Sequence, residues 1–428
     1  MPTKKGRRMA KVLYIGVDWA ADHHDIYLTD EAAGKLGAFR ITHDVAGVDE
    51  LARRIAVLGA EPEAVRVAIE RPAGTRSRVL LVAALLERGY AIYPINPKAA
   101  ERYRERHGTS GAKDDARDAR VLAPILRTDG EHFRRLTPGG EVAAELRLTI
   151  RAYRELVTEG TRLVNQLHAC LADYYPAAPD LFGRLDQPIT LDFLEAFSTP
   201  EAARAAGREA ILAWLKEQGS AQPKRADGVA ERATAKGLAA GAGVVRARRR
   251  QALGLVAALR AVVLAKREHE RALDEILGRH PDGGLFLALP GAGTVTAAAL
   301  LGELGEDRTS FSSADALRQV GGTAPVTIQS GKAKRVVRRR ACDRHLRDAL
   351  LQFARTSRMR AALGDERVAW VLEVYTARRK AGDTAPQADR VVANRWAAIL
   401  WAMWTRRENY DHARYAKARA ARALPKAS

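Results

Sequence analysis

Four acidic residues stand where their side chains could gather. Asp18 and Glu70 each end a short apolar stretch of the kind that forms a buried strand. Two more acids, Asp115 and Asp118, open a helical pattern three residues apart, which puts them on one helix face. Asp114 and Asp118, four apart, would share a face equally well, so spacing alone leaves Asp114 and Asp115 as alternatives.

Carboxylates gathered at one end of a sheet repel each other unless divalent cations neutralise them. Two Mg²⁺ ions roughly 3.5–4 Å apart would activate a nucleophile and stabilise the leaving oxygen in phosphodiester cleavage. Ligands that are all oxygen favour Mg²⁺ or Mn²⁺ over zinc. Each acid taken alone could instead cap a helix or face solvent, but the four together predict a Mg²⁺ site, with Mn²⁺ as a substitute.

A second reactive position is Ser330, which Gly331 and a basic run follow. Up to residue 347 the only acid is Asp343, and the basic residues are Lys332, Lys334, Arg335, Arg338, Arg339, Arg340, Arg344 and Arg347. Such a run would hold several phosphates, and a serine beside it could attack phosphorus if another group takes its proton. The alternative, which the residues alone favour, is an ordinary Ser-Gly turn before a solvated basic helix.

A short glycine motif precedes this run. Residues 290–294 read Pro-Gly-Ala-Gly-Thr and resemble the hairpin of a helix-hairpin-helix element. In such an element Gly291, Gly293 and Thr294 would let a phosphate approach the backbone amides at a helix N-terminus.

The composition points to a polyanionic partner. The 428 residues carry a formal net charge of +20 with a pI of about 10.2, which favours nucleic acid. An anionic membrane is the competing partner, but no apolar run approaches the roughly 20 residues that a spanning helix needs. Two cysteines, Cys170 and Cys342, give no disulfide framework and predict a cytoplasmic protein. With nucleic acid as the expected partner, we expect it to be associated with the nucleoid.

Strand and helix signals alternate in the first 100 residues, in the order of a ribonuclease-H-like α/β domain. The expected strands are 12–17, 25–28, 37–41, 65–69 and 90–95, and the expected helices 48–58 and 76–88. In such a sheet the ends of the first and fourth strands, with Asp18 and Glu70, lie side by side.

From about residue 141 the pattern is helical only. Two apolar stripes, residues 146–171 and 255–276, predict an antiparallel helical hairpin that carries an insert at about 174–243. Helices are also expected at 295–304 and 368–410, the latter with four tryptophans that we interpret as core. The predicted domains are 1–128 (catalytic), 129–281 (helical hairpin), 282–360 (with the serine) and 361–428 (a C-terminal helical extension).

The chain resembles, over almost its whole length, the insertion-sequence transposases of the "IS one-ten" type, which are related to the Piv DNA invertases. The blocks that carry the resemblance are residues 14–18, 68–70, 94–97, 113–119, 289–297, 301–305 and 322–331, with Phe311. Two departures are Asp114, where the family often has threonine, and Cys342-Asp343, where it has Gly-Asn. Neither removes a catalytic position.

The resemblance implies a RuvC-like domain whose last two metal ligands are Asp115 and Asp118 rather than Asp114. It also implies that Ser330 is the nucleophile of a covalent serine–DNA intermediate. The serine would act with the carboxylates of another protomer, so the protein would be a dimer or a tetramer. Members of the family can use a structured non-coding RNA that pairs with donor and target DNA, so this RNA is a further expected partner.

Two alternatives remain. A RuvC-like nuclease would hydrolyse DNA with water and use Ser330 only structurally. A decayed transposase would bind nucleic acid without catalysis, although intact acids at all four positions argue against decay.

Overall fold

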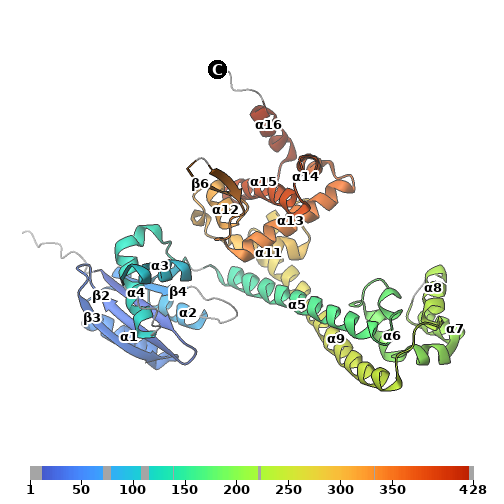
Figure 1. The fold of residues 1–428 in the computed structure, drawn as a ribbon. Coiled ribbons are helices and arrows are strands. Elements are labelled where there is room, and N and C mark those ends of the chain that lie inside the picture. The colour runs from blue at the N-terminus through green and yellow to red at the C-terminus, as the bar shows by residue number, and fades with distance from the viewer. Residues whose placement is uncertain are drawn as a thin grey trace, which may run out of the picture. The chain divides into compact units, whose positions relative to one another are not determined.

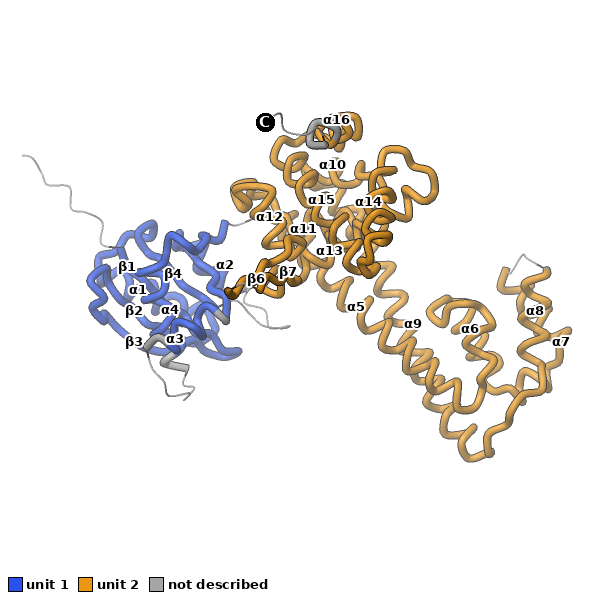
Figure 2. The backbone as a smooth tube through the Cα atoms, turned by 45° about the horizontal axis from the view of Figure 1, so that its top comes forward, with its two compact units in different colours: residues 1–138 blue, residues 139–428 orange. Residues whose placement is uncertain are grey.

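The computed structural model describes residues 12–70, 79–107, 115–137, 139–219, 223–331 and 333–423. The chain divides into two compact units, Met1–Pro138 and Gly139–Ser428, which Figure 2 distinguishes by colour. The first unit is a mixed α/β domain and the second is mostly helical, which confirms the predicted fold class at this level. The finer division at residues 128, 281 and 360 stays a prediction.

The first unit contains a five-stranded sheet with the order β3-β2-β1-β4-β5. Its strands are β1 (Leu13–Trp19), β2 (His23–Thr29), β3 (Lys35–Thr42), β4 (Val65–Glu70) and β5 (Ala91–Ile95). The first three pair antiparallel, whereas β4 runs parallel to β1 and β5 parallel to β4. The predicted sequence of strands and helices is confirmed, and the ribonuclease-H-like assignment stays a prediction.

Helices cover both faces of this sheet (Figure 1), because alternate side chains of each strand point to opposite sides. On one face Ile15 and Val17 pack with α1 (Val45–Val57) and α2 (Val79–Glu87). On the other face Tyr14 packs with α3 (Pro97–His107) and α4 (Asp115–Asp129). The face with α4 is the one that carries the predicted site.

Two long helices of the second unit, α5 (Glu141–Ala172) and α9 (Ala242–Arg279), lie side by side as the predicted hairpin (Figure 1). The insert between them forms α6 (Pro188–Ala196), α7 (Pro200–Glu217) and α8 (Pro223–Thr234). These helices share an apolar core with the adjoining halves of α5 and α9. The insert is therefore a small helical domain at one end of the hairpin.

The remaining residues form a C-terminal helical body. Its helices are α10 (Gly283–Leu287), α11 (Thr294–Leu304), α12 (Ala314–Val320), α13 (Arg344–Ala362), α14 (Ala369–Lys380), α15 (Ala385–Arg406) and α16 (His412–Ala423). Trp370, Trp396 and Trp404 are buried in its core, and Trp401 is partly buried against the same core, as predicted. None of the helices in the described parts of the chain is long and apolar enough to span a membrane.

Arginines of α5 join the base of the hairpin to this body. Arg151 pairs with the buried carboxylate of Glu303 on α11 at 2.7 Å, and Arg154 Nη1 donates to the carbonyl oxygen of His345 on α13 at 2.9 Å. Loss of Arg151 would leave the Glu303 carboxylate buried without its charged partner, which destabilises the fold, although solvent screens the 36% exposed Arg151. The base of the hairpin is thus fixed to the body by charge-assisted contacts.

The basic run after Ser330 is not a helix at its start. Residues Val326–Ser330 (β6) and Ala333–Val337 (β7) form an antiparallel hairpin, and helix α13 begins only at Arg344. The alternation of Val326 and Ile328 with polar residues was the signal for β6. The alternative of a solvated basic helix directly after a Ser-Gly turn is therefore wrong.

Candidate active site and nucleic-acid interface

Asp18 and Glu70 extend from the same face at the carboxyl ends of two neighbouring strands. The parallel register of β1 and β4 pairs Gly16 with Ala68, and each acid lies two residues beyond its member of this pair. Residues two apart on a strand point to the same side. Asp18 and Glu70 therefore lie on the face that α4 covers, at one edge of the sheet.

Helix α4 lies very close to β1. A Cβ atom on Gly16 would stand only 2.0 Å from the carbonyl oxygen of Ala119, so the strand needs a glycine at this position. At the other end of α4, Arg127 Nη1 donates to the carbonyl oxygen of Glu31 at 3.3 Å, in the turn after β2 and level with the start of β1. Since α4 thus runs antiparallel to β1, its first turns face the strand end that bears Asp18.

Asp118 lies in the first turn of α4 and is 9% exposed. Asp18 and Asp118 both interact with other groups of the protein. Asp115 is the first residue of α4, but its side chain, like the whole of Asp114, lies outside the described residues. Three of the four predicted carboxylates, Glu70 included, thus come from elements that converge on one edge. Among the described residues no three acid, histidine or cysteine side chains could by themselves hold a metal ion.

Ser330 lies at the tip of the β6–β7 hairpin. It is exposed, it pairs with Ala333, and Gly331 follows with a φ of 55°. On a two-stranded hairpin the side chains of Ile328 and Arg335 share its face. Within the described residues no side chain forms a hydrogen bond with Ser330. The serine is accessible to a large substrate, and no described side chain of the hairpin accepts a hydrogen bond from it.

The predicted basic interface surrounds this hairpin. Its exposed members are Lys334, Arg335, Arg338, Arg340 and Arg344, while Arg339 and Arg347 are partly buried and Lys332 lies outside the described residues. The single acid of the run, Asp343, accepts hydrogen bonds from the backbone amides at the start of α13 and so caps this helix. Residues 283–428 as a whole contain 26 Lys and Arg against 13 Asp and Glu. Most of the positive surplus of the protein is therefore in the body that carries Ser330.

The glycine motif lies between α10 and α11. Gly291 has a φ of 88°, and a Cβ there would lie 2.9 Å from the Cα of Ser357 on α13, so tight packing also requires this glycine. Gly293 precedes the first residue of α11, and no side chain caps the helix at this position. Thr294 Oγ1 donates to Asp274 on α9 at 3.0 Å. The start of α11 thus has no side-chain cap, and two carboxylates, Asp274 and Glu270, lie beside it together with two arginines of α9.

Sequence reasoning missed two arginines beside this motif. A surface cavity of about 590 Å³ is lined by Gly293 and Thr294 and by the exposed Arg267 and Arg271 of α9. The two arginines lie four residues apart and so share a helix face. That spacing was visible in the sequence, but their proximity to the glycine motif depends on how α9 packs against α11.

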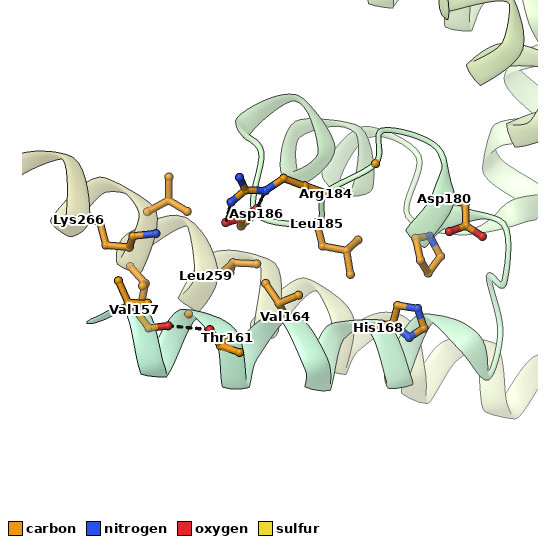
Figure 3. A pocket seen from close by; sticks show the side chains of 15 residues that line it. Val157, Thr161, Val164, His168, Asp180, Arg184, Leu185, Asp186, Leu259 and Lys266 are labelled. Carbon is orange, nitrogen blue, oxygen red and sulfur yellow. Dashed lines mark hydrogen bonds and ion pairs between the residues drawn. The ribbon is translucent and has the colours of Figure 1, made fainter. Parts of the chain in front are cut away.

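A second cavity of about 450 Å³ lies between the helical hairpin and the insert (Figure 3). Aliphatic side chains such as Val157 and Val164 line much of it, and Arg184 pairs with Asp186 at 2.6 Å on its wall. The ion pair neutralises the acid, which leaves His168 and Lys266 as the other titratable side chains beside Asp180. Its lining residues contain no nucleophile paired with a base.

Two family models match separate parts of the chain. Residues 15–176 match the IS110 DEDD transposase model, and residues 284–369 match the model of the transposase IS116/IS110/IS902 family. The first match contains the four carboxylates, and the second contains the glycine motif and Ser330.

Several individual proteins are similar as well. A "mini-circle putative transposase for IS117" from Streptomyces coelicolor is 34% identical over 412 residues, covering 94% of this chain and 96% of the relative. A "putative transposase y4uE" from Sinorhizobium fredii is 40% identical over 47% of this chain and 55% of its own. An "uncharacterized 42 kDa protein" of insertion element IS900 from Mycobacterium paratuberculosis is 29% identical, covering 95% of this chain and 98% of the relative.

Proposed function

Because this chain belongs to the IS110 (IS one-ten) family of transposases, we propose that it cuts and rejoins DNA at a composite site of carboxylates and a serine. The carboxylates are Asp18, Glu70, Asp115 and Asp118, and the serine is Ser330. The observation that carries the proposal is the convergence of β1, β4 and the start of α4 on one edge. The strand order supports a RuvC-like fold for this unit.

The donor set fits Mg²⁺. All the acids offer oxygen ligands only, and Mg²⁺ is usually held by one or two carboxylates together with water and phosphate oxygens. Among the described residues Asp18, Glu70 and Asp118 do not by themselves form a metal-binding group. The proposed site therefore also needs Asp115, water and phosphate oxygens as ligands. A bound Mg²⁺ would neutralise charge on the phosphate and lower the pKa of a nucleophile. The carboxylates position the scissile phosphate at the edge of the sheet.

Ser330 would supply the nucleophile. Its Oγ forms a bond to phosphorus while the bond from phosphorus to one sugar oxygen breaks. The serine proton passes to a base outside the hairpin, and the released sugar oxygen takes up a proton. A hydroxyl of another strand then attacks the phosphoserine diester, which restores the serine and joins the strands. No external energy source is needed, because the diester bond is conserved.

The division of the site between two units predicts a second protomer as a partner, and the positive charge of the protein predicts nucleic acids. The serine and the carboxylates belong to different units, and we propose that they meet between protomers of a dimer or tetramer. The basic body binds donor and target DNA through their backbones. Its charge also suits a structured guide RNA, in which base pairing selects the sequence while the protein contacts the backbone.

A covalent-adduct assay tests the proposal. Purified protein with any RNA that it carries is mixed with Mg²⁺ and labelled DNA that contains an end of the element. Wild type, Ser330→Ala and the control Ser312→Ala are then compared on a denaturing gel. Ser312 is exposed and lies outside the hairpin. We expect a labelled protein band with wild type and Ser312→Ala, and its complete loss with Ser330→Ala.

The second candidate is a metal-dependent nuclease that uses water. It is favoured by the absence, within the described residues, of a side chain that forms a hydrogen bond with Ser330. Cleavage that persists in Ser330→Ala, without an adduct in either protein, would establish hydrolysis and reduce Ser330 to a turn residue.

A further inference from the structure

Three arginines from separate elements meet at the base of the β6–β7 hairpin. Arg338 directly follows β7, Arg347 lies in the first turn of α13, and Arg390 lies on α15. We refer to them as the hairpin-base arginines. Arg390 lies beyond residue 369, where the second family match ends.

Contacts around α15 fix the position of Arg390. One turn after it, Asn394 Oδ1 accepts a hydrogen bond of 3.1 Å from Thr323 Oγ1, in the segment that leads into β6. Residues four apart share a helix face, so Arg390 also faces the base of the hairpin. A Cβ on Gly322 would lie 3.6 Å from Arg347 Cδ, which places Arg347 at the same base.

The acid next to Arg390 is already engaged. Asp389 is buried and receives Arg355 and Arg358 of α13, each at 3.3 Å. The Nε atom of Arg390 is buried without a hydrogen-bond partner, and so is that of Arg339. Among the described residues no carboxylate pairs with Arg390. A buried donor that lacks a partner costs free energy, and such groups usually await a ligand or serve a function.

The charges around Arg390 also favour an anionic ligand at this place. Burial lowers the pKa of Arg390, and the positive charges of Arg338 and Arg347 lower it further. Among the described residues an acid pairs with Arg347 alone of the three, and this acid is Asp348 at 2.8 Å. The fold thus brings like charges together at a place where an anion would stabilise all of them.

We propose that the hairpin-base arginines bind a backbone phosphate of the DNA strand that Ser330 attacks, with Arg390 as the central ligand. This inference rests on the proposed function. A guanidinium group presents parallel N–H donors that match two phosphate oxygens, which a lysine cannot do. From Ala333, opposite Ser330, to Arg338 the strand advances five residues, or about 17 Å at roughly 3.4 Å each. For a hairpin aligned with the DNA axis, along which the rise is about 3.4 Å per nucleotide, the bound phosphate would lie about five nucleotides from the attacked one.

The salt dependence of binding tests this assignment with the full-length protein. The probes are a short duplex DNA of arbitrary sequence and a single-stranded RNA, and the variants are Arg390→Gln and the control Arg378→Gln. Arg378 is also in the C-terminal extension, but Asp383 pairs with it at 2.6 Å. Both changes remove one positive charge. We expect Arg390→Gln to weaken DNA binding about tenfold and to reduce the slope of log affinity against log salt by about 0.9. Arg378→Gln should keep the wild-type slope.

The thermal stability of the ligand-free protein separates a binding role from a structural one. Because Arg390 is repelled by its neighbours, Arg390→Gln should have a Tm equal to or above that of wild type. An unchanged DNA slope, with or without a lower Tm, would overturn the inference. A slope that changes for RNA alone would overturn the assignment to DNA. If the Ser330 adduct did not form, a changed salt slope would still assign DNA binding to Arg390 but would overturn the link to a strand attacked by Ser330. Failure of the wild type to bind either probe would refute the proposed function too.

Discussion

Replacing Gly16 by alanine should displace α4 and inactivate the carboxylate site. The new Cβ would stand 2.0 Å from the carbonyl oxygen of Ala119 and 2.9 Å from the amide nitrogen of Ala123, both backbone atoms. Real Cβ contacts begin at about 3.0 Å, so the helix must retreat by about 1 Å, since backbone cannot rotate away as a side chain does.

That movement has two measurable consequences. Overpacking of this kind costs about 1–3 kcal/mol of the free energy of unfolding. Asp118 moves with α4 relative to Asp18, and a misplacement of about 1 Å can reduce a catalysed rate about 100-fold. We therefore expect a lower Tm together with a loss of single-turnover DNA cleavage that exceeds any loss of folded protein.

Gly130→Ala is the matched control, because its Cβ would meet only the side chain of Leu126 at 3.7 Å. It should keep both the Tm and the cleavage rate of wild type. Wild-type cleavage per folded molecule in Gly16→Ala would refute the reasoning, since it would mean that the position of α4 does not set the site. DNA binding measured without Mg²⁺ should be equal in all three proteins.

Two further predictions concern single side chains. Asp18→Ala should abolish cleavage but leave DNA affinity intact, because Asp18 lies at the strand end rather than in the basic body. The control Asp22→Ala, at an exposed acid, should retain both cleavage and affinity. An equal loss of DNA affinity in Asp18→Ala would show that Asp18 has a structural role. Burial lowers the pKa of His280 from its usual 6.5, although Glu306 opposes this. The unfolded chain therefore takes up a proton at higher pH than the folded chain, and the free energy of unfolding should fall as the pH drops below about 6.5. Urea denaturation at pH 8 and at acidic pH should show a smaller fall in the free energy of unfolding for His280→Asn than for wild type. In this variant the amide oxygen can replace Nδ1 as acceptor for the Asp282 amide. An identical fall in both proteins would contradict the assignment of this pH dependence to His280.

The first unit was predictable because its strands are short apolar runs of fixed order, and the position of an acid at a strand end follows from that order. The close approach of α4 had a signal too, since a glycine in the middle of a buried strand often marks contact with another backbone. The choice between Asp114 and Asp115 needed the family resemblance, because both lie at helical spacing from Asp118.

Other features depend on contacts that the sequence does not encode locally. The β6–β7 hairpin is exposed on both sides, so its alternation of apolar and polar residues is weak, and basic residues obscure it. Arg267, Arg271 and Arg390 look like ordinary solvated charges until the packing of α9 and α15 shows their neighbours. Long-range placement, rather than residue type, brings these arginines to the glycine motif and to the base of the β6–β7 hairpin.

The anchored base of α5 makes the helical hairpin a lever. The 18 residues that follow Arg154, up to Ala172, extend about 27 Å at roughly 1.5 Å per residue, so a tilt of about 5° at the anchored base corresponds to about 2 Å at the insert. Conversely, a displacement of about 2 Å at the insert corresponds to a rotation of about 5° at the base. Because Arg154 is bonded to the backbone of His345, that rotation reaches the start of α13, next to the basic run. A partner that binds the insert and displaces it would therefore also move the segment that follows Ser330.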